Sequence, residues 1–351
     1  MNFASDNAGP MHPKVLAALT AANEGYAMPY GNDPIMDEVR DRIRTTFEAP
    51  DAAVYLVATG TAANALALAT YTDPWQTVFA HRVSHVEEDE CGAPEFYAGG
   101  AKLTLVEGDS AKMDPQALRQ TILGTGQKDV HSIQRGPVTI TQATEVGTVY
   151  SLDEIRQITD IAKEFGLKTH LDGARFANAC ATLGCSAAQM TWKAGIDMVS
   201  FGGTKNGCAG VEAVIFFDPK KAWEFELRRK RGAHLFSKHR YLSAQMQAYM
   251  TDDLWLELGA KANANMARLA AGLASIEGAE IPDAPQANMI FAHLPRAAHK
   301  RAMAAGAKYY LFPMNVSLED GPDDELIRCR MVCDWFKTSE EIDQMISTLR
   351  G

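Results

Sequence analysis

The sequence lacks most features that would assign it to a specialised class of protein. No stretch approaches the ~18 consecutive apolar residues of a membrane helix. The opening residues, MNFASDNAGP, have neither the basic region nor the apolar run of a signal peptide. There is no long block of like charges, no low-complexity segment and no internal repeat. We therefore expect a folded cytoplasmic protein.

Motifs for metals and nucleotides are also missing. The six cysteines include no CxxC pair, and the histidines form no HExxH. There is no GxGxxG, no Walker sequence and no GxSxG elbow. These absences argue against a metal site, a dinucleotide fold, a P-loop enzyme and a serine hydrolase. We interpret Cys329 and Cys333, four residues apart, as buried reduced thiols.

The composition indicates a large enzyme-sized core with an acidic surface. The 351 residues are 46% hydrophobic, which is enough for one large domain and a smaller one. A formal net charge of −10 argues against a nucleic-acid surface. The only basic cluster is Arg228–Arg231.

Helical and strand-like segments alternate along the first two thirds of the chain. The strand-like runs are short and apolar at consecutive positions, as expected for strands covered on both faces. This alternation predicts an α/β fold with a wound, mostly parallel sheet over 53–217. Long helices are expected over 237–259 and 261–276, and strands over 288–294 and 326–335. We predict a large domain over 1–240 and a smaller α+β domain over 241–351.

Two strand ends carry a lysine and an aspartate 33 residues apart. Lys205 lies in the turn SFGGTKNG after an apolar run, and Asp172 ends another run in HLDGAR. Lysine as a Schiff base and aspartate at a pyridinium nitrogen are the protein groups that pyridoxal phosphate (PLP) chemistry needs most. Taken singly, the lysine could be an ordinary solvated cation. Asp172 could be half of a surface pair with Arg175.

Other candidates follow neighbouring strands, whose carboxyl ends gather ligands in α/β sheets. Gly60 and Thr61 precede a helix whose amino end could bind a phosphate; a plain helix cap is the alternative. His85 could lie flat on a cofactor ring, or be a solvated loop histidine, with Glu87–Glu90 as acids of a helix start. The polar segment TQATEVGTVY could bind a ligand through its hydroxyls and Glu145, or serve as a turn.

Arginines could hold a substrate carboxylate. Arg175 follows Asp172 closely, and Arg330 lies in an alternating strand of the small domain, with Ser5 near them if the amino-terminal segment is tied down. Arg231, which ends the basic cluster, or Lys238, which follows it, could reach a phosphate across a subunit boundary. The alternative is that the cluster is a solvated helix end.

Together these motifs resemble the L-threonine aldolases of the β-eliminating lyase family, PLP enzymes with the aspartate-aminotransferase fold (fold type I). The resemblance covers nearly the whole chain. It rests on FASDN, YGNDP, ATGTAAN, SHVEEDECGAPEF, TQATEVGTVY, HLDGARFANA, SFGGTKNG, RRKR and the Arg330 strand. The chain looks most like the low-specificity bacterial branch.

The resemblance implies a role for each candidate. Lys205 would carry PLP, with Asp172 at the ring nitrogen, Gly60 and Thr61 at the phosphate and His85 on the ring. The substrate carboxylate would be bound by Ser5, Arg175 and Arg330, with Tyr30 of YGNDP nearby. It also implies cofactor contacts for Arg175, Arg231 and Lys238. His85, His131 or a water between them would accept the substrate hydroxyl proton. The usual assembly is a tetramer with active sites at a subunit interface.

The expected reaction is retro-aldol cleavage of L-threonine or L-allo-threonine to glycine and acetaldehyde. Alternatives on the same scaffold are cleavage of β-aryl serines, β-elimination and transamination. A non-catalytic protein that binds PLP or an amino acid is the alternative from another class.

Overall fold

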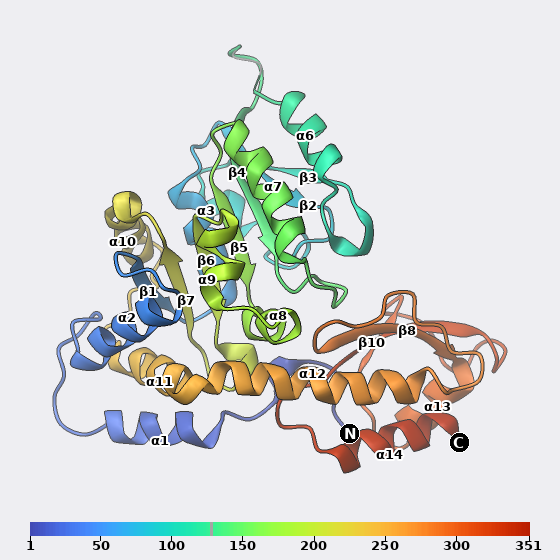
Figure 1. The fold of residues 1–351 in the computed structure, drawn as a ribbon. Coiled ribbons are helices and arrows are strands. Elements are labelled where there is room, and N and C mark those ends of the chain that lie inside the picture. The colour runs from blue at the N-terminus through green and yellow to red at the C-terminus, as the bar shows by residue number, and fades with distance from the viewer. Residues whose placement is uncertain (127–128) are drawn as a thin grey trace.

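The computed structural model describes residues 1–126 and 129–351, and its centre is a seven-stranded sheet (Figure 1). The strand order is β1-β7-β6-β5-β4-β2-β3. Only β7 runs antiparallel to its neighbours, β1 and β6. The predicted wound, mostly parallel sheet is therefore confirmed. The strands are β1 (Ala53–Val57), β2 (Gln76–His81), β3 (Lys102–Val106), β4 (Gln134–Thr141), β5 (Thr169–Gly173), β6 (Met198–Gly202) and β7 (Glu212–Phe216).

Both faces of this sheet are buried, which explains why its strands are apolar at consecutive positions. In β1, Leu56 belongs to one core cluster and its neighbours Tyr55 and Val57 to another. The helices of this part are α1 (Pro13–Ala22), α2 (Pro34–Thr46), α3 (Gly60–Thr70), α4 (His85–Glu88), α5 (Ala93–Tyr97), α6 (Pro115–Leu123), α7 (Leu152–Glu164), α8 (Phe176–Leu183), α9 (Ala187–Met190) and α10 (Ala222–Arg231).

The two long helices that follow divide at a different place from the one predicted. Helix α11 (Arg240–Met250) ends before Asp252 and Asp253, which have left-handed backbone angles (φ 53° and 52°), and α12 continues unbroken over Leu254–Leu273. The expected break after Gly259 is therefore wrong. A Cβ atom on Gly259 would lie 2.7 Å from the backbone of Ala177, so this glycine allows α12 to cross α8 closely.

The carboxyl-terminal part has its own small sheet and core. Strands β8 (Met289–Pro295), β10 (Leu326–Val332) and β9 (Tyr310–Phe312) pair antiparallel in that order, with α13 (Arg296–Ala304) and α14 (Ser339–Arg350) beside them. Phe3, at the other end of the chain, belongs to this second core. The amino-terminal segment is thus tied to the small sheet, and Phe3 N–H donates to Lys308 O at 2.7 Å.

Helix α12 crosses the lower half of the view in Figure 1, above α1 and α14, and passes from one core to the other. Leu258 belongs to the large core, whereas Met266 belongs to the small one. We therefore propose a domain boundary within α12 rather than at residue 240. Among the described residues, no helix is both long and apolar enough to cross a membrane.

Candidate active site

Two cavities that share lining residues lie at the carboxyl edge of the parallel strands. The smaller, of about 250 Å³, is bounded by the start of α3, the end of β5 and the turn after β6. The larger, of about 670 Å³, extends toward β9 and β10 of the small sheet. Asn7, His85 and Lys205 line both cavities. One site therefore spans both domains.

Lys205 is presented by a braced turn. Strand β6 ends at Gly202, and a single 3-10 turn, Thr204–Asn206, follows. The buried carboxylate of Glu212 accepts a hydrogen bond from Gly203 N–H at 2.8 Å. Asn206 donates to the hydroxyl of Tyr249 at 2.7 Å and to a backbone carbonyl at 2.8 Å. The amine therefore projects from a rigid support.

Asp172, at the end of β5, is a buried carboxylate bound by two donors. Its Oδ1 accepts from Ala174 N–H at 3.1 Å, and its Oδ2 accepts from Asn64 Nδ2 at 2.9 Å. No cation pairs with it among the described residues. An anion held in this way at a cavity wall is suited to a positively charged ring nitrogen.

Helix α3 directs its amino end into the smaller cavity. The Thr59 hydroxyl caps the helix by accepting from Ala62 N–H at 3.2 Å, and Thr61 lines the cavity beside it. A Cβ atom added to Gly60 would meet no atom within 4 Å, so the fold itself leaves this space open. Unpaired N–H groups and the helix dipole favour an anion there.

His85 is held from behind by a buried acid. Its Nδ1 lies 2.8 Å from Glu90 Oε1, and the same oxygen accepts from Asn64 at 2.8 Å. Burial alone would lower the pKa of His85, but the Glu90 hydrogen bond and the Asp172 charge raise it above its ordinary value. Burial also raises the pKa of Glu90. The imidazole therefore lines the cavity while its Nδ1 faces a buried acid.

The amino-terminal segment supplies an ion pair at the domain junction. Arg175 donates to both oxygens of Asp6, from Nε at 2.8 Å and from Nη2 at 3.1 Å. Although burial opposes ionisation, Arg175 and Lys205 hold the pKa of Asp6 below its ordinary value. Because breaking such a buried pair typically costs about 3–5 kcal/mol, this contact fixes Ser5 and Asn7 in the cavity wall.

Two arginines of β10 face the larger cavity from the small domain. Arg330 and Arg328 are two residues apart and lie on one face of the strand. The Cζ of Arg330 lies 4.9 Å from the centre of the Tyr310 ring, and the Cζ of Arg328 lies 4.5 Å from the centre of the Phe291 ring. The Nε of Arg330 is buried without a hydrogen-bond partner among the described residues. Burial and the nearby Arg175 lower the pKa of Arg330, as expected for a cation awaiting an anion.

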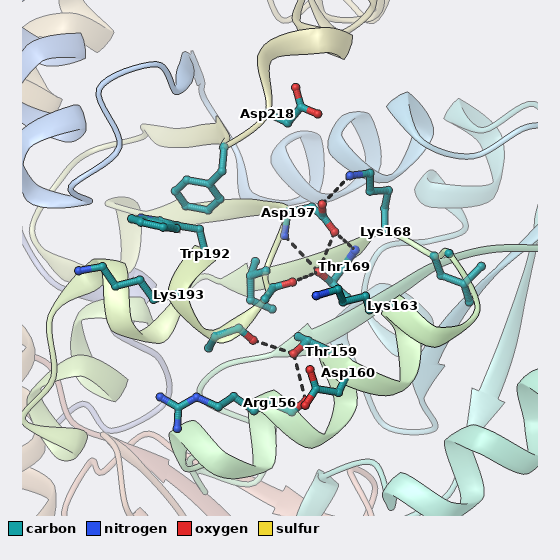
Figure 2. Close-up of a pocket in the computed structure, with 16 residues that line it drawn as sticks. Arg156, Thr159, Asp160, Lys163, Lys168, Thr169, Trp192, Lys193, Asp197 and Asp218 are labelled. Atoms are coloured by element: carbon teal, nitrogen blue, oxygen red, sulfur yellow. Dashed lines mark hydrogen bonds and ion pairs between the residues drawn. The ribbon is translucent and has the colours of Figure 1, made fainter.

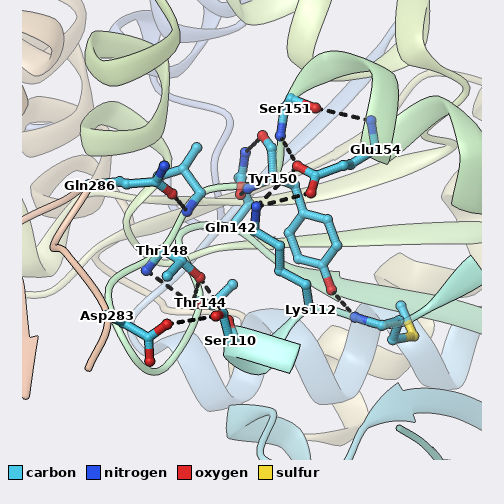
Figure 3. A network of polar contacts seen from close by, with 12 residues as sticks. Ser110, Lys112, Gln142, Thr144, Thr148, Tyr150, Ser151, Glu154, Asp283 and Gln286 are labelled. Atoms are coloured by element: carbon cyan, nitrogen blue, oxygen red, sulfur yellow. Dashed lines mark hydrogen bonds and ion pairs between the residues drawn. The ribbon is translucent and has the colours of Figure 1, made fainter. Parts of the chain in front are cut away.

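The polar segment TQATEVGTVY begins at the last residue of β4, and most of its side chains form a hydrogen-bonded turn rather than a ligand site (Figure 3). Gln142 bonds both backbone groups of Tyr150, and the Thr144 and Thr148 hydroxyls bond each other at 2.7 Å. Gln286, which precedes the small sheet, accepts from Val149 N–H at 2.7 Å. Most of this segment thus braces the domain junction, while Glu145 lines the larger cavity.

Four predicted site residues are not brought to these cavities within one chain. His131 is exposed before the amino end of β4, at the edge of the sheet opposite the site. Tyr30 lies on the surface against Lys230, whose Nζ is 5.2 Å from its ring centre. Lys238 is exposed near Tyr30, and Arg231 lines a separate hollow near Tyr97.

Sequence reasoning missed three buried polar groups of the site. Glu90 was expected to be an acid of a helix start, but α4 ends at Glu88 and Glu90 points inward. Asn64 and Glu212 are buried polar residues in otherwise apolar segments, TAANALAL and VEAVIFF. A polar residue inside an apolar helix or strand was the available signal, because burial requires a partner for it.

A further cavity, of about 740 Å³, lies at the opposite edge of the sheet (Figure 2). Its polar groups bind one another: Lys168 donates to Asp197 at 2.6 Å, and Thr159 donates to Ala194 O at 2.7 Å. It contains no buried unpartnered polar side chain among the described residues. The chemistry therefore concentrates at the carboxyl edge.

The site can hold a ligand of definite chemistry. It offers an amine, a buried anion that lines the same cavity, an anion-binding helix end and arginines for a carboxylate. An imidazole lies between these groups. This set suits an aldehyde-bearing, phosphorylated ring beside an amino acid.

Comparisons with known proteins agree with this geometry. The family model described as Beta-eliminating lyase matches residues 2–296. The chain is 39% identical to a low specificity L-threonine aldolase of Pseudomonas aeruginosa, over 99% of this chain and 96% of the relative.

Solved structures extend the similarity to three dimensions. The Leishmania major threonine aldolase superimposes with a TM-score of 0.90 at 27% identity, covering 99% of this chain and 98% of the other. A structure of SPT with PLP has a TM-score of 0.68 at 15% identity, covering 100% of this chain and 86% of the other, and so supports the fold alone.

Proposed function

The chain belongs to the β-eliminating lyase family, and from that premise we propose that it is a PLP-dependent aldolase. It cleaves L-threonine and L-allo-threonine to glycine and acetaldehyde. The observation that carries this proposal is the placement of Lys205, Asp172 and Gly60 around one cavity that opens toward Arg330. The 39% identical relative from Pseudomonas aeruginosa is a low specificity L-threonine aldolase, which supports threonine as the substrate.

The residues present fit PLP. Lys205 would bind its aldehyde carbon, Asp172 its ring nitrogen, and Gly60 with Thr61 its phosphate, where a Cβ atom is absent and space is open. When bound, the cofactor supplies an electron sink for cleavage of the substrate Cα–Cβ bond. Asp172 would keep the ring nitrogen protonated, because a buried carboxylate favours a positive charge beside it.

The protein then orients the substrate and moves its protons. Arg330, with Ser5 and the free edge of the Arg175 guanidinium, binds the carboxylate and so fixes the bond to be cleaved. His85 accepts the proton of the β-hydroxyl as the aldehyde leaves. With PLP bound, the Lys205 amine would take up the proton that the substrate ammonium gives up and would deliver it to the glycine carbon. General acid–base help of this kind contributes about 10²–10⁴-fold.

A direct assay tests the proposed activity. Purified protein with PLP should release acetaldehyde from L-threonine and L-allo-threonine. Pyruvate or ammonia release would instead indicate β-elimination, and amine loss that requires a keto acid would indicate transamination. The aromatic wall of Phe291, Tyr310 and Phe312 supports phenylserine as a second substrate, with benzaldehyde as its product. Bound PLP without any turnover would indicate a binding protein.

We also propose a homotetramer with the site near a subunit interface. Tyr26, Met28 and Tyr30 form an exposed apolar strip, with fractional exposures of 108%, 64% and 40%. Ser237 and Lys230 contact Tyr30, so Lys238 belongs to the same surface. In this proposal a second copy docks on this surface, and Lys238 is the cation that reaches the phosphate across the subunit boundary. The cytoplasmic location stays a prediction.

A further inference from the structure

We propose that Glu90 and Asn64 are positioning residues for His85 and Asp172. Glu90 keeps a proton on His85 Nδ1, so that Nε2 is the atom that accepts the substrate hydroxyl proton, and Asn64 joins the Glu90 and Asp172 carboxylates. This inference rests on the proposed function and deepens it. It gives a role to Glu90 and Asn64, which act through His85 and Asp172 and do not contact the reacting atoms themselves.

The first support is the geometry of the shared oxygen. Glu90 Oε1 lies 2.8 Å from His85 Nδ1 and 2.8 Å from Asn64 Nδ2. When Glu90 is ionised its oxygen can only accept, so the ring nitrogen that faces it carries the proton. The Glu90 side chain has no solvent exposure, so water does not compete for this contact. The other ring nitrogen is left free of Glu90.

The second support is the path of the backbone. Helix α4 ends at Glu88, and Cys91 and Gly92 adopt left-handed angles of φ 53° and 70°. These angles reverse the chain directly after Glu90 and direct its side chain back beneath His85. A left-handed cysteine is uncommon and costs energy, so the surrounding structure must enforce the turn.

The third support is the amide between the two acids. Asn64 Nδ2 donates to Glu90 Oε1 at 2.8 Å and to Asp172 Oδ2 at 2.9 Å. His85, Glu90 and Asp172 are close enough to hold a metal ion, with ligand atoms within 4.8 Å of one another. Two N–H donors directed at the carboxylates oppose a cation there, so hydrogen bonds explain the cluster better than a metal.

Charges around His85 set the sign of the pH effect. The groups that face it are Glu90, Asp172 at the end of β5, Lys205 after β6 and Glu145 in the segment after β4. Glu90, Asp172 and Glu145 raise the pKa of His85, whereas burial and Lys205 lower it. Removing the Glu90 charge must therefore lower this pKa.

The kinetic test uses Glu90→Gln, which keeps the side-chain shape, and Glu87→Gln as a control at an exposed position of α4, which ends before Glu90. Glu90→Gln should lower kcat for threonine by about 10²-fold, within the range of a positioned base. The acid limb of its pH profile should move to lower pH, while KM changes less than about threefold. Glu87→Gln should match the wild type in both respects.

A spectroscopic test reads the tautomer without turnover. The ¹⁵N shifts of the His85 ring, assigned with His85→Gln, should show Nδ1 protonated in the wild type and a shift toward Nε2 protonation in Glu90→Gln.

A binding measurement tests the part assigned to Asn64. Asn64→Leu should weaken PLP binding by about tenfold or more, because Asp172 loses a donor.

The possible failures are distinguishable. A wild type that releases no acetaldehyde would refute the proposed function, whatever the tautomer. A wild type that cleaves threonine, with Glu90→Gln unchanged in both pH profile and ring shifts, would overturn the positioning role. Unchanged PLP affinity in Asn64→Leu would refute the part assigned to Asn64.

Discussion

At the scale of single residues, the site depends on buried charges whose partners come from distant parts of the chain. Asp6 and Arg175 are 169 positions apart, yet they bind through two hydrogen bonds. Glu212 holds the turn that presents Lys205. Such groups are costly to bury unless they are paired, and each pairing here fixes a catalytic group in place.

Glu212 should make stability depend on pH. Burial raises its pKa from 4.5 to about 7. Between these two values the folded protein binds more protons than the unfolded chain, so stability falls as pH rises through this window. Glu212→Gln removes the titrating group and keeps an acceptor for Gly203 N–H. Its Tm should therefore fall less than that of the wild type between pH 5 and pH 8.

The control for this effect is Glu24→Gln, a change at an exposed acid. Its Tm should follow the wild-type pH dependence. Equal pH dependence in Glu212→Gln and the wild type would show that Glu212 does not titrate in this window.

At the scale of elements, helix α3 serves the fold and the ligand with different residues. Its interior is buried, and Thr59 caps it. Gly60 lies at its first position with open space where a Cβ atom would be. The fold does not require this glycine, but a phosphate approaching the helix end would.

Gly60→Val should separate these two roles. We expect a Tm within about 2 °C of the wild type and a PLP dissociation constant raised by at least about tenfold, because the added methyl groups occupy the anion site. Gly202→Ala should instead destabilise the fold, because its Cβ atom would lie only 2.4 Å from Ala174 O. Wild-type PLP affinity in Gly60→Val would place the phosphate elsewhere.

The elements that the sequence predicted well are those whose pattern is local. The strands over 53–57 and 102–106 were predicted with the same bounds as the structure has, because apolar runs between turn residues are local signals. The break between α11 and α12 was misplaced because Gly259 serves a helix crossing, which only tertiary structure reveals. Lys205 and Asp172 could be chosen from strand ends. Asn64 stands out only as a polar residue in an apolar helix, because its partners Glu90 and Asp172 lie 26 and 108 positions away and the fold alone brings them together.

At the scale of the whole molecule, the site lies where two cores meet. The amino-terminal segment joins the small sheet, α12 belongs to both cores, and Arg330 faces the large domain across the cavity. We propose that the exposed strip of Tyr26, Met28 and Tyr30 contacts a further subunit.

Met28→Glu tests the assembly. A charge in this apolar strip should shift the tetramer to smaller species in light scattering after size exclusion, because a buried unpaired carboxylate is costly. PLP affinity should fall in parallel if the interface supplies cations to the phosphate. Lys14→Glu, an exposed change on α1, serves as the control. A Met28→Glu tetramer with unchanged mass would refute this interface.

The most direct test of the account is chemical labelling of the lysine. Protein incubated with PLP is reduced with borohydride, digested and mapped by mass spectrometry. We predict a single pyridoxyl group on Lys205, in the peptide that contains SFGGTKNG, and no stable label at that peptide in Lys205→Ala. A label on a different lysine, or none in the wild type, would contradict the account.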